Sequence, residues 1–319
     1  MGDVSFADLS EKLSLIVLCG VLVLLWWGGN EKAYGAAQIH VVSQARGLSG
    51  TKTIAVQVEA RTWKPRGRLL YDIEGSVRVK LADAGFHVVR TAREPHGLTL
   101  TVLYQETKGE PYGINQFGTV ITGTFRLAHH MRGTLLELTV QETAKPSISG
   151  PPPYLDALQN FQTNPYYYFL GDILWGHVNK QWDVTTVFLH ALRKSSQRKA
   201  QEIEDPDLSR FTRPDHTMIS PHEVFAPIAI KHTIQELVKL QESRVIPLLY
   251  ALLKYPNVYV QVACIEGFGA LQLVDALPVL YELREHASSI EVRHAAQVVS
   301  ETLQDLLPSS FLLLHHLFS

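Results

Sequence analysis

One unit is written twice between residues 244 and 303, and this repeat constrains the fold more than any other feature. The first copy reads VIPLLYALLKYPNVYVQVACIEGFGAL, and the second reads ALPVLYELREHASSIEVRHAAQVVSETL. Pro247 and Pro278 are 31 residues apart, while Val260 and Val292 are 32 apart, because one residue is added in the turn. Self-similarity at this period predicts a solenoid of stacked helix pairs.

Each copy also contains the signals of two helices joined by a turn. A proline opens the first helix, where its missing N–H costs no hydrogen bond. Turn residues follow at 255–257 in one copy and at 287–289 in the other. The second helix carries small residues such as Ala263, Gly267 and Ala295, which allow two helices to approach closely. Neither pair can bury its apolar face alone, so neighbouring pairs must stack.

This pattern resembles the HEAT-like repeats of the short bacterial kind, first met in phycobilin lyases (PBS-lyase type). The resemblance implies an α-solenoid over residues 221–306, in which 223–240 is a degenerate half-repeat and the apolar residues 307–319 are a cap. It carries no catalytic residue to this chain. Cys264 aligns with Ala296 of the sister copy, so we expect a small buried side chain there.

The first 37 residues predict a signal peptide or an N-terminal membrane anchor. Residues 13–27 are an uncharged apolar run, shorter than the roughly 20 residues of a spanning helix and typical of a signal-peptide core. Small residues allow cleavage after Gly35 or Ala37. The acidic residues before the core are unlike a normal basic leader, so cleavage, a retained anchor and a buried helix all remain open. The first two predict an exported protein in the periplasm or cell envelope, with possible membrane association through residues 13–27.

Residues 38–143 predict a small α+β domain, a β-α-β unit followed by a β-meander. Apolar and polar residues alternate in the strands, and an amphipathic helix ends at Gly85. The expected strands are 53–59, 86–90, 98–104, 119–127 and 135–140, and the expected helix is 68–84. This arrangement resembles small domains of bacterial envelope lipoproteins and assembly factors. The fold class is therefore α+β, a sheet domain followed by an all-α region.

The remaining segments differ in composition. Residues 144–153 are a proline-rich linker, 154–204 are aromatic-rich and helical, and 205–220 are an irregular link. Aromatic side chains with polar tips suit a membrane-interface belt, a partner surface or the joint between the sheet and the repeats. The long loop at 108–117 is also suited to recognition. The candidate partner-binding residues are Tyr112, Asn115, Tyr167, Trp175 and Trp182.

The sequence contains no catalytic motif and implies no cofactor. It has no nucleophile elbow, phosphate loop or dinucleotide fingerprint. A weak metal candidate combines proper ligand types without helical ligand spacing. Its residues are Asp215, His216, His222 and Glu223. The net charge of −2 has no basic excess, which argues against nucleic acid as a partner.

These observations favour a non-enzymatic scaffold of the cell envelope, whose helical repeats bind a protein partner. Enzyme activity stays open, and an enzyme or enzyme subunit of the lyase-like type is one alternative. A peripheral membrane-binding protein is another. The sequence leaves the oligomeric state undetermined.

Overall fold

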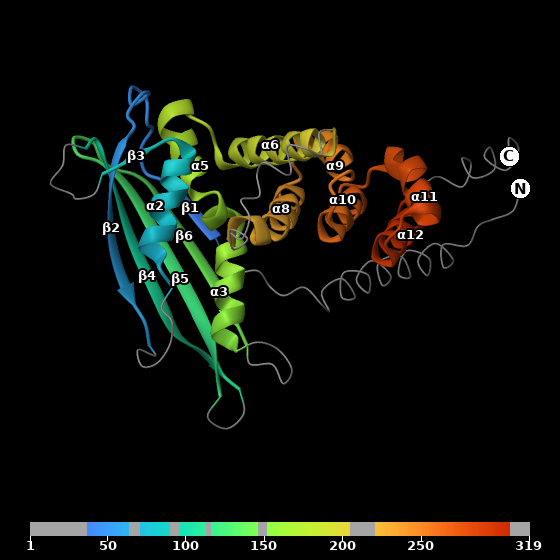
Figure 1. Ribbon diagram of the computed structural model, residues 1–319, viewed down its shortest axis with the longest axis horizontal. Coiled ribbons are helices and arrows are strands. Elements are labelled where there is room, and N and C mark those ends of the chain that lie inside the picture. Colours follow the sequence, from blue (N-terminus) through green and yellow to red (C-terminus); the bar gives the residue numbers. More distant parts are fainter. Residues whose placement is uncertain are drawn as a thin grey trace, which may run out of the picture. The chain divides into compact units, whose positions relative to one another are not determined.

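The chain folds as an α+β protein, with a mixed sheet followed by helices (Figure 1). The computed structural model describes residues 37–63, 71–89, 96–112, 116–145, 152–204 and 221–306, without the side chains of 197–204 and 221–225. Residues 36–319 form one compact unit. The predicted leader up to residue 36 and the predicted cap at 307–319 lie outside the described residues. Within those residues, no helix is both long enough and apolar enough to cross a membrane.

The sheet has six strands in the order β1-β6-β5-β4-β2-β3. Strand β2 is parallel to β3 and β4, and the other neighbours are antiparallel. This arrangement confirms the predicted β-α-β unit followed by a meander, and it adds the edge strand β1. The strands are β1 (Ala37–Val41), β2 (Thr53–Arg61), β3 (His87–Val88), β4 (Leu98–Pro111), β5 (Phe117–His129) and β6 (Gly133–Ala144).

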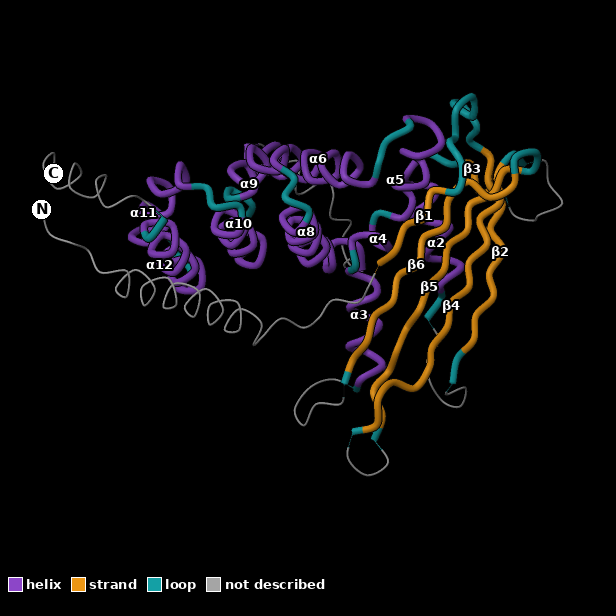
Figure 2. The backbone as a smooth tube through the Cα atoms, turned by 180° about the vertical axis from the view of Figure 1, so that it is seen from behind, coloured by secondary structure: helices purple, strands orange, loops and turns teal. Residues whose placement is uncertain are grey.

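One face of the sheet is buried under two helices. Helices α2 (Ile73–Ala84) and α3 (Pro153–Thr163) lie on the same face (Figure 1), and Figure 2 shows the strands from the other side. Alternate residues of β4 point into this core, which explains the period of two in the sequence. Those residues are Leu98, Leu100, Val102, Tyr104 and Glu106, all buried.

Helix α2 has its start and its end fixed by single residues. The Asp72 carboxylate accepts a hydrogen bond from the Gly75 amide at 2.8 Å, so the described helix begins at Ile73 rather than at Arg68. Gly85 ends it with φ of 107°, a left-handed conformation that glycine adopts without steric cost. The predicted stop at Gly85 is therefore confirmed.

Asn164 joins the sheet to the helices that follow. Its side-chain oxygen accepts from the Tyr166 amide at 3.0 Å, which caps α4 (Pro165–Tyr168). Its amide nitrogen donates to the buried Glu142 carboxylate on β6 at 2.8 Å. One side chain thus starts a helix and satisfies a buried acid. Helix α5 (Leu170–Trp175) and a π-helix (Gly176–Lys180) come next.

Lys80 of α2 is buried between tyrosines. Its ammonium donates to the Tyr168 carbonyl at 3.1 Å and lies 4.8 Å and 4.9 Å from the ring centres of Tyr167 and Tyr168. Burial lowers the pKa of Lys80 to about 8, although the nearby carboxylates of Asp172 and Asp83 favour its charged form. The cation–π contacts and the carbonyl compensate for part of its lost hydration.

The C-terminal part is all helical. It comprises α6 (Val184–Glu204), α8 (Pro221–Lys239), α9 (Ile246–Leu252), α10 (Val258–Ala270), α11 (Leu277–His286) and α12 (Ile290–Gln304), with 3-10 turns at Ser243–Val245 and Val274–Ala276. Helix α6 packs against α8 and α9, and its residues Val187, Phe188 and Leu192 are buried in the same core as the repeats.

His232 ties α8 to the end of α3. Its Nδ1 lies 3.1 Å from the Thr163 carbonyl oxygen, to which it donates, and the imidazole is buried. Burial lowers the pKa of His232 from 6.5 to about 4, against the opposing effect of this hydrogen bond.

This lowered pKa predicts acid sensitivity between pH 6.5 and pH 4. In that window the unfolded chain binds a proton that the folded chain does not, so the stability contribution is present above pH 6.5 and is lost as pH falls. We expect a loss of about 2 kcal/mol at pH 5 relative to pH 7.5. Urea unfolding of the protein and of His232→Gln at both pH values measures the difference. Identical pH profiles would contradict this role.

Candidate binding surfaces

The repeat helices form two layers, and the second helix of each pair runs parallel to the next. A Cβ added at Gly267, late in α10, would contact Val238, which is late in α8. A Cβ added at Gly269 would contact Val299, in the second half of α12. Helices α8, α10 and α12 therefore stack side by side in one direction. Helices α6 and α9 pack against each other in the other layer. Helices α6 and α8 therefore form a third helix pair, in addition to the two pairs that the sequence predicts.

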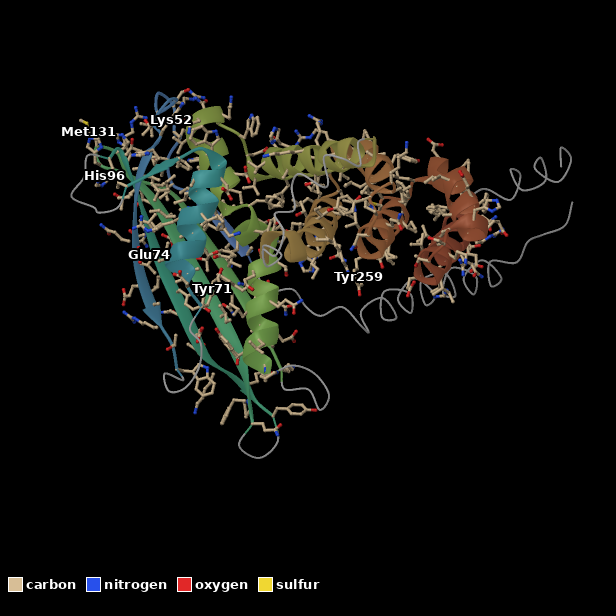
Figure 3. The ribbon with its side chains drawn as sticks, in the orientation of Figure 1. Lys52, Tyr71, Glu74, His96, Met131 and Tyr259 are labelled. Atoms are coloured by element: carbon tan, nitrogen blue, oxygen red, sulfur yellow. The ribbon has the colours of Figure 1, made fainter. Side chains whose placement is uncertain are left out.

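Because these second helices are parallel, their N-terminal ends lie along one edge. Tyr259 is 63 % exposed in the first turn of α10, and Ile290 is 68 % exposed at the start of α12. Asn257 caps α10 by accepting from the Tyr259 amide at 3.0 Å, and Ser289 caps α12 by accepting from the Val292 amide at 3.3 Å. We call Tyr259 and Ile290 the repeat edge; Figure 3 labels Tyr259.

The repeat edge was not among the residues predicted from the sequence, although a signal for it exists. In α10 the buried stripe is Val260, Cys264 and Phe268, spaced by four. Tyr259 falls off this stripe, two residues after the capping Asn257, so its ring has no place in the core. The same argument applies to Ile290, which precedes the buried Val292. The prediction that Cys264 is a small buried residue is confirmed, and burial raises the pKa of its thiol.

The five predicted partner-binding residues occupy different environments. Tyr112 is 52 % exposed, and Asn115 lies outside the described residues. Tyr167 is only 1 % exposed, so it serves the core and offers no contact surface. Trp175 is half-buried with its ring edge-on to Phe86, 4.9 Å between centres, and Trp182 lies 5.0 Å from the His190 ring. The structure does not bring the four described residues into one site.

Tyr112 belongs to an aromatic tip where β4 turns into β5. The Lys108 ammonium lies 5.3 Å from the Trp63 ring centre and 4.7 Å from that of Phe117. Phe117 is partly exposed, as is Tyr112. The lysine stem and these rings cover one another, so the tip is a small ordered surface.

A buried hydroxyl network lies between the sheet and α2. The Tyr104 hydroxyl donates to Glu106 at 2.8 Å, and the Tyr71 and Tyr167 hydroxyls lie 2.7 Å apart and both reach Ser76. Burial raises the pKa of Tyr104, and the adjacent Glu106 raises it further. Tyr104, Glu106 and Tyr167 are all buried from solvent, so the network stabilises the packing of α2 on the sheet.

The weak metal candidate is not tested by the structure. Asp215 and His216 lie outside the described residues, and His222 and Glu223 lie in α8 where side chains are not described. Across the residues that are described, no three His, Cys, Asp or Glu side chains are grouped to hold a metal ion.

Comparisons with known proteins identify the repeats. A family model of HEAT repeats matches residues 226–300, which span α8 to α12. No curated protein matches the chain.

Two solved structures show weak likeness. The PelC dodecamer from Paraburkholderia phytofirmans has 17% identity and a TM-score of 0.26, covering 36% of this chain and 86% of that one. The hypothetical protein CT253 from Chlamydia trachomatis has 10% identity and a TM-score of 0.26, covering 40% of this chain and 98% of that one. With TM-scores below 0.5, neither likeness supports an inference about this chain.

Proposed function

We propose that this chain, whose residues 226–300 are HEAT repeats, is a non-enzymatic scaffold that holds a protein partner on its repeat edge. HEAT repeats are protein-interaction modules whose stacked helices offer an extended surface. The observation that carries the proposal is the pair of large apolar side chains, Tyr259 and Ile290, exposed on parallel neighbouring helices. Aromatic and aliphatic anchors of this kind dominate the energetics of protein interfaces.

The repeat edge is rigid enough to recognise a partner. Each anchor sits within the first turn of a capped helix, and both helices have buried stripes that hold them against their neighbours. The backbone at Tyr259 and Ile290 is therefore held in place before a partner binds, which lowers the cost of ordering on binding.

A photo-crosslinking experiment tests this surface. We expect p-benzoylphenylalanine at Tyr259 to give a defined protein adduct in the cells that make the chain. The same group at Glu285, an exposed residue of the first-helix layer, is the control and should give none. With the purified partner, Tyr259→Ala should weaken binding at least tenfold. Adducts of equal yield from both positions, or an unchanged affinity, would rule out the repeat edge.

We also propose that the protein works in the bacterial cell envelope. This location is supported by the apolar run at 13–27 and the small residues that follow it. Fractionation with N-terminal sequencing distinguishes a cleaved exported protein, a membrane-anchored protein and a cytosolic protein. An exported protein beginning near residue 36 or 38 means cleavage, an intact Met1 in the membrane fraction means an anchor, and an intact Met1 in the cytosol refutes export.

A further inference from the structure

Several loops meet at the end of the sheet where β5 turns into β6. The Arg132 guanidinium donates to the Arg46 carbonyl, and the His130 ring nitrogen Nδ1 lies 3.4 Å from the Gly97 carbonyl oxygen. The His87 amide donates to the Lys52 carbonyl at 2.8 Å. These bonds join the loops into one surface. We call it the basic end, and it consists of residues 42–52, 87–88, 96–97 and 129–132.

The charge of the basic end has one sign. Arg46, Lys52 and Arg132 are basic and exposed. Four imidazoles lie among them, those of His87, His96, His129 and His130. The residues that make up the basic end include no Asp or Glu. Burial lowers the pKa of His129, and His130 and Arg132 lower it further, which reflects how closely these cations are gathered.

Large apolar side chains stand out from the same end. Met131, at the tip of the β5–β6 turn, is 81 % exposed. Val41 and Val42, which leave β1 beside β6, are 51 % and 48 % exposed. Figure 3 shows Met131, His96 and Lys52 at this one end of the sheet. The exposed Met131 side chain buries little apolar surface within its own chain, so it contributes little to the stability of the fold.

The other end of the same strands differs. There Arg61 pairs with Glu59 at 2.5 Å and Lys145 pairs with Glu110 at 3.4 Å, while the Lys108 ammonium lies over the Trp63 and Phe117 rings. Strand β4 runs from Leu98 at the basic end to Pro111 at the far end, so these two ion pairs lie at the opposite end of the sheet from the basic end.

We infer that the basic end docks on a membrane surface that contains anionic phospholipid. Lys and Arg near a bilayer are attracted to its phosphates, and each contributes about fivefold to partitioning. Exposed apolar side chains among those cations enter the interface between headgroups and acyl chains. Nucleic acid would use the cations but leave Met131 and the two valines in water. This inference does not depend on the partner proposed for the repeat edge.

Charge reversal at matched positions tests the inference in the full chain. We expect Arg46→Glu/Lys52→Glu to weaken binding to phosphatidylglycerol/phosphatidylcholine vesicles by at least about 25-fold in a flotation assay. The control, Arg61→Glu/Lys145→Glu, changes the net charge equally at the far end of the sheet and should alter binding less than about twofold. The N-terminal apolar run is the same in both variants, so its own contribution cancels in the comparison.

A fluorescent probe reports on the contact itself. An environment-sensitive dye on Met131→Cys, in a Cys19→Ser chain whose remaining Cys264 is buried, should shift to the blue only with anionic vesicles. The same dye on Tyr112→Cys should not shift. Equal binding of the two charge-reversed variants, or an unshifted dye at 131, would overturn the inference. Binding to heparin without binding to the vesicles would overturn it too, because the surface would then recognise polyanions alone.

Discussion

Leu280→Asp should unfold the last repeat while the sheet stays folded. Leu280 is fully buried in α11, where it packs in the core shared by α10 and α12. The substitution removes a large apolar side chain and leaves a carboxylate without hydration, which together cost about 4 kcal/mol or more. Because each repeat is stabilised by its neighbours, the damage spreads first through α11 and α12. Limited proteolysis with mass spectrometry should show new cuts between residues 271 and 306.

Val298→Asp is the matched control, since it places the same charge in α12 at a partly exposed position. It should leave the proteolysis pattern unchanged and shift stability by less than about 0.5 kcal/mol. If Leu280→Asp were as stable as Val298→Asp, the assignment of a stacked repeat core at this position would be wrong.

Gly171→Ala should separate α5 from α2. A Cβ at this position would overlap the carbonyl oxygen of Lys80, a backbone atom that cannot rotate away. Alanine favours a helix by up to about 1 kcal/mol over glycine, but the overlap with backbone outweighs this gain. We expect a net loss of about 3 kcal/mol, seen as a lower midpoint in urea unfolding.

Gly269→Ala is the corresponding control in α10. The atoms nearest to the added methyl there belong to the side chain of Val299, which need shift by only a few tenths of an ångström. Its effect should be within about 1 kcal/mol of zero. Equal destabilisation by the two variants would mean that the Gly171 contact carries no special constraint.

The sequence was sufficient to predict elements in which apolar residues recur with a single helical or strand period. The repeat register, the stop of α2 at Gly85 and the capping role of Asn164 all follow from local chemistry. The alternation of apolar and polar residues predicted the buried face of β4 only as far as Tyr104. The next buried residue on that face is Glu106, whose carboxylate breaks the apolar pattern. That acid is tolerated since Tyr104 donates to it, a contact that no pattern of apolar residues reveals.

Other features depended on packing between distant segments. Strand β1 has five residues, three of them exposed, and it forms only because β6 offers an edge. Tyr167 has an amphipathic side chain suited to a surface, yet it packs 4.4 Å from Phe161 and 5.6 Å from Phe125, measured between ring centres. Helix α6 shares no evident sequence pattern with α9 and α11, so its place in the repeat layer could be found only from its contacts.

The rate at which the buried Lys80 amine is modified also reports how often the core around it opens. An acylating reagent attacks uncharged amines, and the pKa of Lys80 is lowered only while its side chain is buried. Its burial beneath Tyr168 nevertheless denies the reagent access. Acylation of Lys80 therefore requires α2 and α4 to separate. The acylation rate measures how often this local opening occurs. Mass spectrometry of this single residue follows breathing of the core in a fully folded population.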